Sequence, residues 1–183
     1  MREIGNKASA VYPLMALAGL LLEGGELDTA AQFYAESLSI REQIGDKKGC
    51  SETLDGIASC ALAQRDLAAA HAAAQRGLRL RQELGDSHIG FDLIGCAAIS
   101  AAAADWAAAV RLSAVAERER NAAGLVWVRA LAQQHASTLA AARAAVGATT
   151  FERLWTAADL LSLADAVALV LARSSPFLPQ EPP

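Results

Sequence analysis

The chain has 183 residues, of which 54% are hydrophobic and only 5% aromatic. A core of this composition consists mainly of alanine and aliphatic side chains, and alanine-rich sequences favour helices. The formal net charge of −4 and the lack of a basic run argue against nucleic-acid binding. We find no apolar stretch long enough to span a bilayer and no secretory signal in residues 1–10, so we expect a cytoplasmic protein with no membrane partner.

A short motif recurs every forty residues. Ile4-Gly5-Asn6 returns as Ile44-Gly45-Asp46 and again as Leu84-Gly85-Asp86. A period of this size is typical of helical solenoids, in which each helix pair buries its apolar face against the next pair. We expect the second and third glycines to end helices in the left-handed conformation, and the aspartates after them to cap the following helix. We expect the first motif to end a helix whose body lies upstream, in repeats that precede residue 1.

A second recurring block opens the second helix of each pair. An acidic residue at positions 26, 66 and 105 is followed by a large apolar residue and, three residues later, by an alanine. These two side chains share one helix face, so Ala30, Ala70 and Ala109 should lie at close helix contacts. The predicted helix pairs are 8–23 with 27–44, 48–64 with 67–84, and 87–103 with 106–121.

The period ends after Gly124, and a different organisation follows. Residues 125–146 predict one long amphipathic helix, and the spacing of Thr149 and Glu152 predicts a capping box at the start of a short one. A last apolar helix over 163–172 should be buried against the long helix. The charge run 117–120 is typical of a solvated helix face. The predicted domains are three helix pairs over 1–124, capping helices over 125–173, and a mobile proline-rich tail over 174–183.

Segments 17–27 and 30–34 resemble tetratricopeptide (TPR) repeats, although the period here is longer than the usual one. The second helices end in Arg-x-x-Ile/Leu-Gly-Asp, which is similar to repeats at the C-terminal end of large bacterial signal-transduction ATPases, including LuxR-like transcriptional regulators. Segments 138–147, 151–155 and 161–167 are similar to the ending of the same regulators. The resemblance implies an all-α, right-handed TPR-like solenoid with C-terminal capping helices. It also implies a sensor or scaffold region that controls an ATPase switch and transcription.

No motif for catalysis is present. The sequence has no phosphate-binding GxxxxGK[ST] loop, no nucleophile elbow, and no Cys/His spacing suited to a metal. We therefore predict no enzyme, no catalytic residue, no cofactor and no metal site. The cysteines and histidines are expected to be packing residues: Cys50, Cys60, Cys96, His71, His88 and His135.

In TPR arrays the first helix of each pair lines a concave surface. Here apolar positions surround the acidic Glu52 and Asp55, a mixture that suits an amphipathic helix or an extended peptide with a basic residue. The partner would be a protein or peptide, including the ATPase region of the full-length chain. Two alternatives remain open: a small-molecule effector in the same groove, or simple packing against neighbouring helices. The predicted partner-binding residues are Tyr12, Met15, Glu52, Asp55, Ser59, Phe91 and Ile94.

The first helix pair offers a further surface. Apolar side chains at Tyr12, Met15, Leu20 and Leu21 are expected to be exposed if earlier repeats are missing. An exposed apolar face of this kind favours association. The sequence therefore also predicts a homo-oligomer that forms through the N-terminal repeat.

Overall fold

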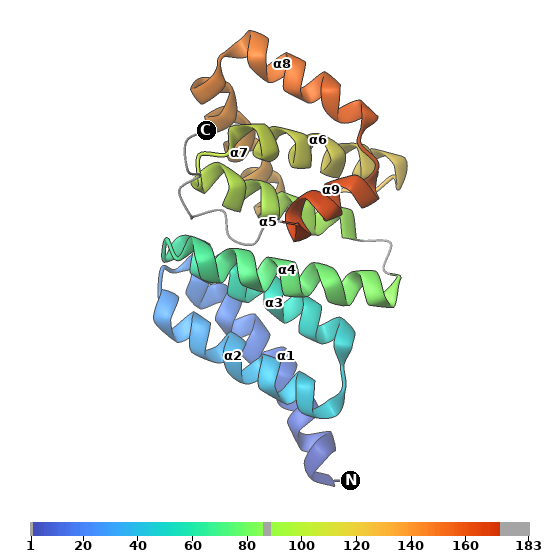
Figure 1. Cartoon of the computed structure of the whole chain (residues 1–183). Helices are drawn as coiled ribbons and strands as arrows, with labels where there is room; N and C mark the ends of the chain where they lie inside the picture. The colour runs from blue at the N-terminus through green and yellow to red at the C-terminus, as the bar shows by residue number, and fades with distance from the viewer. Residues whose placement is uncertain (1, 86–88, 173–183) are drawn as a thin grey trace. The chain divides into compact units, whose positions relative to one another are not determined.

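The computed structural model describes residues 2–85 and 89–172, with side chains from residue 11 onward. Within these residues the chain forms nine α-helices and one 3₁₀ turn, with no strand, and the helices pack in consecutive pairs (Figure 1). The predicted all-α fold is confirmed. The chain divides into two compact units, residues 1–86 and residues 87–183, and the third helix pair belongs to the same unit as the capping helices.

The first unit contains two helix pairs whose helices pack in chain order. α2 packs on both α1 and α3, and α4 packs on α3. Ala18 of α1, Ala30 and Tyr34 of α2 and Cys60 of α3 form one buried cluster that joins the first three helices. The bounds of the last three helices agree with the sequence prediction to within one residue. The four helices are α1 (Arg2–Glu23), α2 (Leu27–Ile44), α3 (Lys47–Ala63) and α4 (Leu67–Leu84).

The start of α1 differs from the prediction. The helix runs without a break from Arg2 through residues 4–6, so Gly5 does not end a helix as Gly45 and Gly85 do. A glycine permits a left-handed turn but does not impose one, and continued helix gives the backbone groups of residues 4–6 their i→i+4 partners. The motif therefore marks helix ends only at its second and third occurrences.

The turns between helices follow the predicted chemistry except at Glu26, whose side chain caps no backbone N–H, and at Asp86, which lies outside the described residues. Gly45 and Gly85 are left-handed C-caps, with φ of 72° and 61°. Asp46, Asp66 and Asp105 each accept a hydrogen bond from the backbone N–H three residues later, which satisfies a donor at the start of the next helix. The repeated glycine and aspartate positions therefore set where each helix ends and the next begins.

A second left-handed position recurs between the two helices of each pair. Gly25 has φ of 82°, and its repeat counterparts Arg65 and Ala104 have φ of 64° and 60°. Residues with a Cβ are strained in this conformation, so the last two turns are less stable than a glycine would make them.

The alanine prediction is confirmed. Ala30, Ala70 and Ala109 are completely buried, each at a helix contact where a larger side chain would displace a neighbour. Gly56 marks an even closer approach, because a Cβ built there would lie 2.3 Å from Cε1 of Tyr34. The ring of Tyr34 therefore rests directly on the backbone of α3.

The second unit is built around α6. This helix contacts α5, α7, α8, the 3₁₀ turn η1 and α9, and it is buried along most of its length. α9 packs on α5 and α6, not on the long helix α7 as the sequence suggested. The elements of this unit are α5 (Ile89–Ala102), α6 (Trp106–Ala122), α7 (Arg129–Val146), α8 (Ala148–Ala157), η1 (Ala158–Leu160) and α9 (Leu163–Leu171).

The long helix begins four residues later than predicted. Gly124 adopts φ of 63° and Val128 is extended, so residues 125–128 form a connection before α7. The connection is held by Trp127, whose ring lies edge-on to His135 with centroids 4.4 Å apart. The guanidinium of Arg120 lies 4.5 Å from the centroid of the same ring. Packing of the indole thus overrides the helical pattern of the sequence.

The predicted capping box at Thr149 is wrong, because α8 begins at Ala148 with Gly147 as its N-cap and no side-chain bond. A capping box forms instead at the start of α9. There Ser162 Oγ accepts the N–H of Asp165, and Asp165 Oδ2 accepts the N–H of Ser162. The two segments have the same residue spacing, and only the second forms the reciprocal bonds.

The charge run 117–120 is not a plain solvated face. Arg118 donates hydrogen bonds to the carbonyl oxygens of Ala158 (3.1 Å) and Leu161 (2.7 Å), which ties the turn before α9 to α6. Glu117 Oε2 lies 3.2 Å from Nε2 of His135 on α7. These side chains therefore hold the capping helices in place. The predicted mobile tail, 174–183, lies outside the described residues.

No single helix among the described residues has the length and apolarity needed to cross a membrane, although α8 with η1 and α9 would pass by length and composition as a pair bent by 111°. In the second unit, α9 is packed on α5 and α6.

Candidate protein-binding surface

The predicted partner-binding residues of α1 differ sharply in exposure. Tyr12 is 75% exposed, whereas Met15 is half-buried and packs against the cluster that contains Ala18 and Tyr34. The guanidinium carbon of Arg41 lies 5.8 Å from the centroid of the Tyr12 ring, within the range of a cation–π contact. Tyr12 thus offers an open ring face beside the end of α2.

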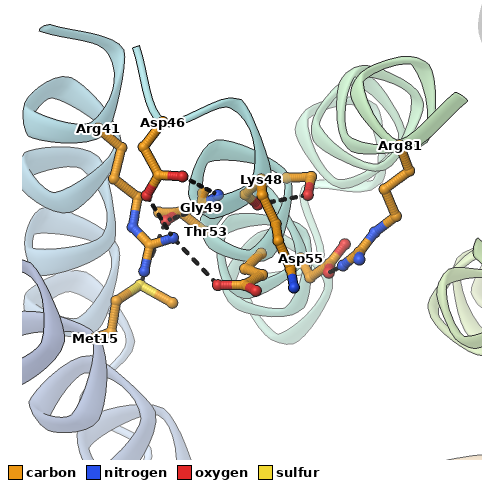
Figure 2. Close-up of polar contacts among 10 residues, drawn as sticks. Met15, Arg41, Asp46, Lys48, Gly49, Thr53, Asp55 and Arg81 are labelled. Atoms are coloured by element: carbon orange, nitrogen blue, oxygen red, sulfur yellow. Dashed lines mark hydrogen bonds and ion pairs between the residues drawn. The ribbon is translucent and has the colours of Figure 1, made fainter. Parts of the chain in front are cut away.

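Glu52 is held by the buried arginine at the end of α2. Nη1 of Arg41 lies 3.2 Å from Oε2 of Glu52 and 3.5 Å from Oδ2 of Asp46, and Arg41 itself is only 3% exposed (Figure 2). Gly49 makes this arrangement possible, since a Cβ there would lie 1.8 Å from Nη1 of Arg41. The charge of a buried guanidinium is therefore balanced by two half-exposed carboxylates at the start of α3.

Asp55, also on α3, is paired in the same way with an arginine of α4. Its Oδ2 lies 2.7 Å from Nη2 of Arg81, which is also buried, at the end of α4 (Figure 2). Arg41 and Arg81 are forty residues apart, so each second helix of this unit ends in an arginine that binds an acid of α3. Ser59, the next predicted residue, is half-buried and donates its hydroxyl to the carbonyl oxygen of Asp55 at 2.9 Å.

These pairs change the electrostatics expected from the sequence. Asp46, Glu52 and Asp55 supply three negative charges, and the two arginines reduce the local sum to −1. A basic partner would therefore meet a largely compensated surface. The arginine at the end of α4 also makes charge reversal at Asp55 a stability perturbation, because a new guanidinium would face the buried one.

The two remaining predicted residues lie on α5 in the second unit. Phe91 is half-buried, and Ile94 is completely buried. The prediction that the Ile94 side chain faces a partner is wrong, because α5 packs its apolar positions against α6, α7 and α9. The sequence register placed Ile94 on the same face as Met15, but α7 and α9, which follow the repeats, pack on α5.

The second unit has an open hollow of about 320 Å³ between α6, α7 and α8. The rings of Phe151 and Trp155 stack with centroids 5.8 Å apart, and the guanidinium of Arg143 lies 4.5 Å from the Phe151 centroid. Arg143 also pairs with Glu152. The volume of this hollow is at the lower end of the range for ligand pockets. It is lined by Glu117, Leu139, Ala140, Arg143, Phe151, Glu152 and Trp155.

The cysteines and described histidines are packing residues. Cys50, Cys60 and Cys96 are buried and form no disulfide, and burial raises the pKa of the Cys50 and Cys60 thiols. Burial lowers the pKa of His135, more than its hydrogen bond to Glu117 raises it. His88 lies outside the described residues. Among those described, no group of three or more His, Cys, Asp or Glu side chains is arranged to hold a metal ion.

The sequence reading missed the role of the two buried arginines. Each is the first residue of the motif Arg-x-x-Ile/Leu-Gly-Asp, and the exact forty-residue recurrence of this arginine indicates that it has a structural role. An arginine at a helix end usually stays in water, so recurrence alone does not say that it is buried against an acid.

Comparison with known families agrees with this architecture. Residues 10–83 match the family model of the tetratricopeptide repeat, from the first described side chains of α1 to the end of α4. These residues are therefore a TPR region, and TPR regions generally serve as protein–protein interaction modules and are typically non-catalytic. No catalytic family is detected. No curated protein and no solved structure gives a match.

Proposed function

We propose that the chain is a non-catalytic protein-binding module whose partner contacts the face around Tyr12. The observation that carries this proposal is the exposed Tyr12 ring, with Met15 on the same helix and the Arg41–Glu52 pair beside it. Tyrosine is among the side chains enriched at the energetic centre of protein interfaces. Glu52, Asp55 and Ser59 form the polar part of the face.

The partner that fits is an amphipathic helix or an extended peptide with one apolar anchor. Tyr12 and Met15 supply the apolar contact, while the half-exposed carboxylates of Glu52 and Asp55 attract a basic donor of the partner. The face proposed here consists of residues of the first unit, and Phe91, which lies in the second unit, stays a separate prediction. Ile94 is no part of the proposal, because its side chain is buried.

We propose, from the sequence resemblance, that this module is the C-terminal sensor or scaffold region of a larger bacterial ATPase-type transcriptional regulator in the cytoplasm. The longer second helices ending in Arg-x-x-Ile/Leu-Gly-Asp and the closing segments 138–147 and 161–167 support this assignment. The partner would then be a protein, including the ATPase region of the same polypeptide. Direct binding of nucleic acid forms no part of the proposal.

The binding face can be tested with displayed peptides of 12–20 residues selected on the immobilised full chain. Selected peptides should bind Tyr12→Ser at least about tenfold more weakly, since truncating an anchoring tyrosine commonly costs about 2 kcal/mol or more and about 1.4 kcal/mol is tenfold. Leu160→Ser is the matched control, because Leu160 is also highly exposed but lies in the second unit. Binders with equal affinity for the parent and Tyr12→Ser would place the partner site elsewhere.

A small-molecule sensor is the alternative, and the hollow between α6, α7 and α8 favours it. Two stacked rings with the Arg143–Glu152 pair at their edge would suit a flat ligand with an ionic group. A thermal-shift screen with anionic aromatic metabolites would detect it. A saturable shift that Arg143→Ala removes, together with failure of the peptide selection, would replace the first proposal by this one.

A further inference from the structure

One side of α1 exposes an apolar stripe that begins one turn after Tyr12 and continues along the same exposed side of the helix. Leu17 is 44% exposed and Leu20 is 67% exposed, and Ala16, one turn before Leu20, is exposed as well. The opposite side of the helix is buried through Val11 and Ala18. Of the four residues predicted from sequence to be exposed here, Met15 and Leu21 instead pack on the core cluster.

The chain itself shows how such a stripe is covered. Forty residues further on, the same positions of α3 are Gly56, Ile57 and Cys60. All three lie against α2: the Tyr34 ring rests on Gly56, Ile57 packs on the cluster around Tyr34, and Cys60 is buried within it. The stripe on α1 is therefore the repeat counterpart of an established helix–helix interface, that between α2 and α3.

We propose that the stripe of Ala16, Leu17 and Leu20 binds an alanine-rich amphipathic helix, the second helix of a further helix pair. A helix bound there continues the stacking of α2 on α3 by one more repeat. This occupant follows from the repeat equivalence of the two faces. It does not depend on the binding face around Tyr12.

The residue at position 16 restricts the occupant further. α1 carries Ala16 where α3 has Gly56, and a Cβ at that place in α3 would lie 2.3–2.7 Å from the ring of Tyr34. A helix like α2 therefore cannot seat its tyrosine on α1 without a shift. α4 has Ala74 at the position of Tyr34, so the occupant resembles α4 and has a small side chain opposite Ala16.

A fusion protein tests this proposal. A copy of residues 47–86 is joined directly to Lys7 of the full chain, in place of residues 1–6. The junction Gly85-Asp86-Lys7 then reproduces the sequence Gly45-Asp46-Lys47 between the existing pairs. Leu20→Cys supplies a thiol at the counterpart of Cys60, and its rate of maleimide labelling reports exposure of the stripe. The native cysteines are buried and serve as the unreactive reference, and the added copy carries Cys50→Ser and Cys60→Ser because its first helix has no preceding α2 to cover them.

The added repeat should slow labelling at position 20 at least about tenfold relative to the unfused Leu20→Cys chain. Ala74→Tyr in the added copy should restore most of the rate. A second fusion with residues 7–46 provides an independent check: the copy carrying Tyr34→Ala should protect the thiol and the copy with Tyr34 should not. In each fusion, the rise in helical circular dichroism reports whether the added pair has folded.

Three results would overturn the proposal. Equal labelling rates in the fused and unfused chains, with the added helices folded, would mean that the stripe does not receive a helix. Equal protection by copies with alanine and tyrosine would refute the size rule at position 16. Labelling of the unfused chain that slows as its own concentration rises would make a second copy of the chain the occupant.

Discussion

The contact between Tyr34 and Gly56 gives the sharpest test of the packing. Gly56→Ala places a Cβ 2.3 Å from Cε1 and 2.5 Å from Cζ of the ring, where carbon atoms normally stay 3.5–4.0 Å apart. The ring is buried and cannot move away freely. Overpacking of this kind costs about 1–3 kcal/mol, while replacing a helical glycine by alanine returns about 0.5–1 kcal/mol. We expect a net loss of stability of up to about 2.5 kcal/mol.

Gly19→Ala is the matched control in the same unit. Gly19 lies inside α1, and a Cβ there would meet only the hydroxyl of the same Tyr34, at an ordinary distance of 3.8 Å. This variant should gain about 0.5–1 kcal/mol from helix propensity alone. Urea unfolding followed by circular dichroism should therefore separate the two variants by about 1–3 kcal/mol.

A double-mutant cycle identifies the cause of that difference. In a Tyr34→Ala background the ring is gone, so Gly56→Ala should become stabilising, as Gly19→Ala is in the parent. If Gly56→Ala and Gly19→Ala stabilise the parent equally, the ring does not rest on Gly56 and the α2–α3 interface described above is wrong.

Three further perturbations have expected outcomes. Ala70→Leu should cost about 1–3 kcal/mol in urea unfolding, whereas Ala72→Leu, exposed on the same helix, should stay within about 0.5 kcal/mol; equal effects would refute the register of α4. The pKa of His135 in the folded protein lies below the usual 6.5, so as the pH falls this imidazole is protonated in the unfolded chain before it is protonated in the folded one. The parent should therefore lose stability relative to His135→Gln as pH falls below about 6.5, and parallel pH profiles would contradict this. Arg65→Gly should raise stability by about 0.5–1 kcal/mol by relieving the left-handed backbone, and a decrease would show that no strain is present.

The fold could be predicted largely because its information is local and repeated. Glycine and aspartate at forty-residue intervals determine where helices end and begin, and the same residues recur often enough to fix the register. The prediction fails where one side chain overrides the pattern. Trp127 is such a case, since its contacts with Arg120 and His135 keep residues 125–128 out of the long helix.

The binding face could be predicted only in part. The sequence places Tyr12 and Glu52 on equivalent positions of two helices, but it does not show that Glu52 is taken by Arg41 or that Asp55 is taken by Arg81. Such pairs join residues 11 and 26 positions apart in the sequence, and they depend on how closely the helix ends approach. Burial of Ile94 likewise depends on helices that follow the repeats.

The paired acids also decide how a partner would be bound. With a local charge near −1, long-range attraction contributes little, and affinity rests on the apolar contact at Tyr12. The Kd of a selected peptide should therefore change by less than about threefold between 0.05 and 0.2 M salt, because compensated charges leave little field to screen. The Kd of the same peptide for the Arg41→Met variant should depend more strongly on salt, because this substitution removes the cation that neutralises Asp46 and Glu52. A tenfold salt effect on the parent would mean that these carboxylates act as free charges and that the ion pairs do not persist in solution.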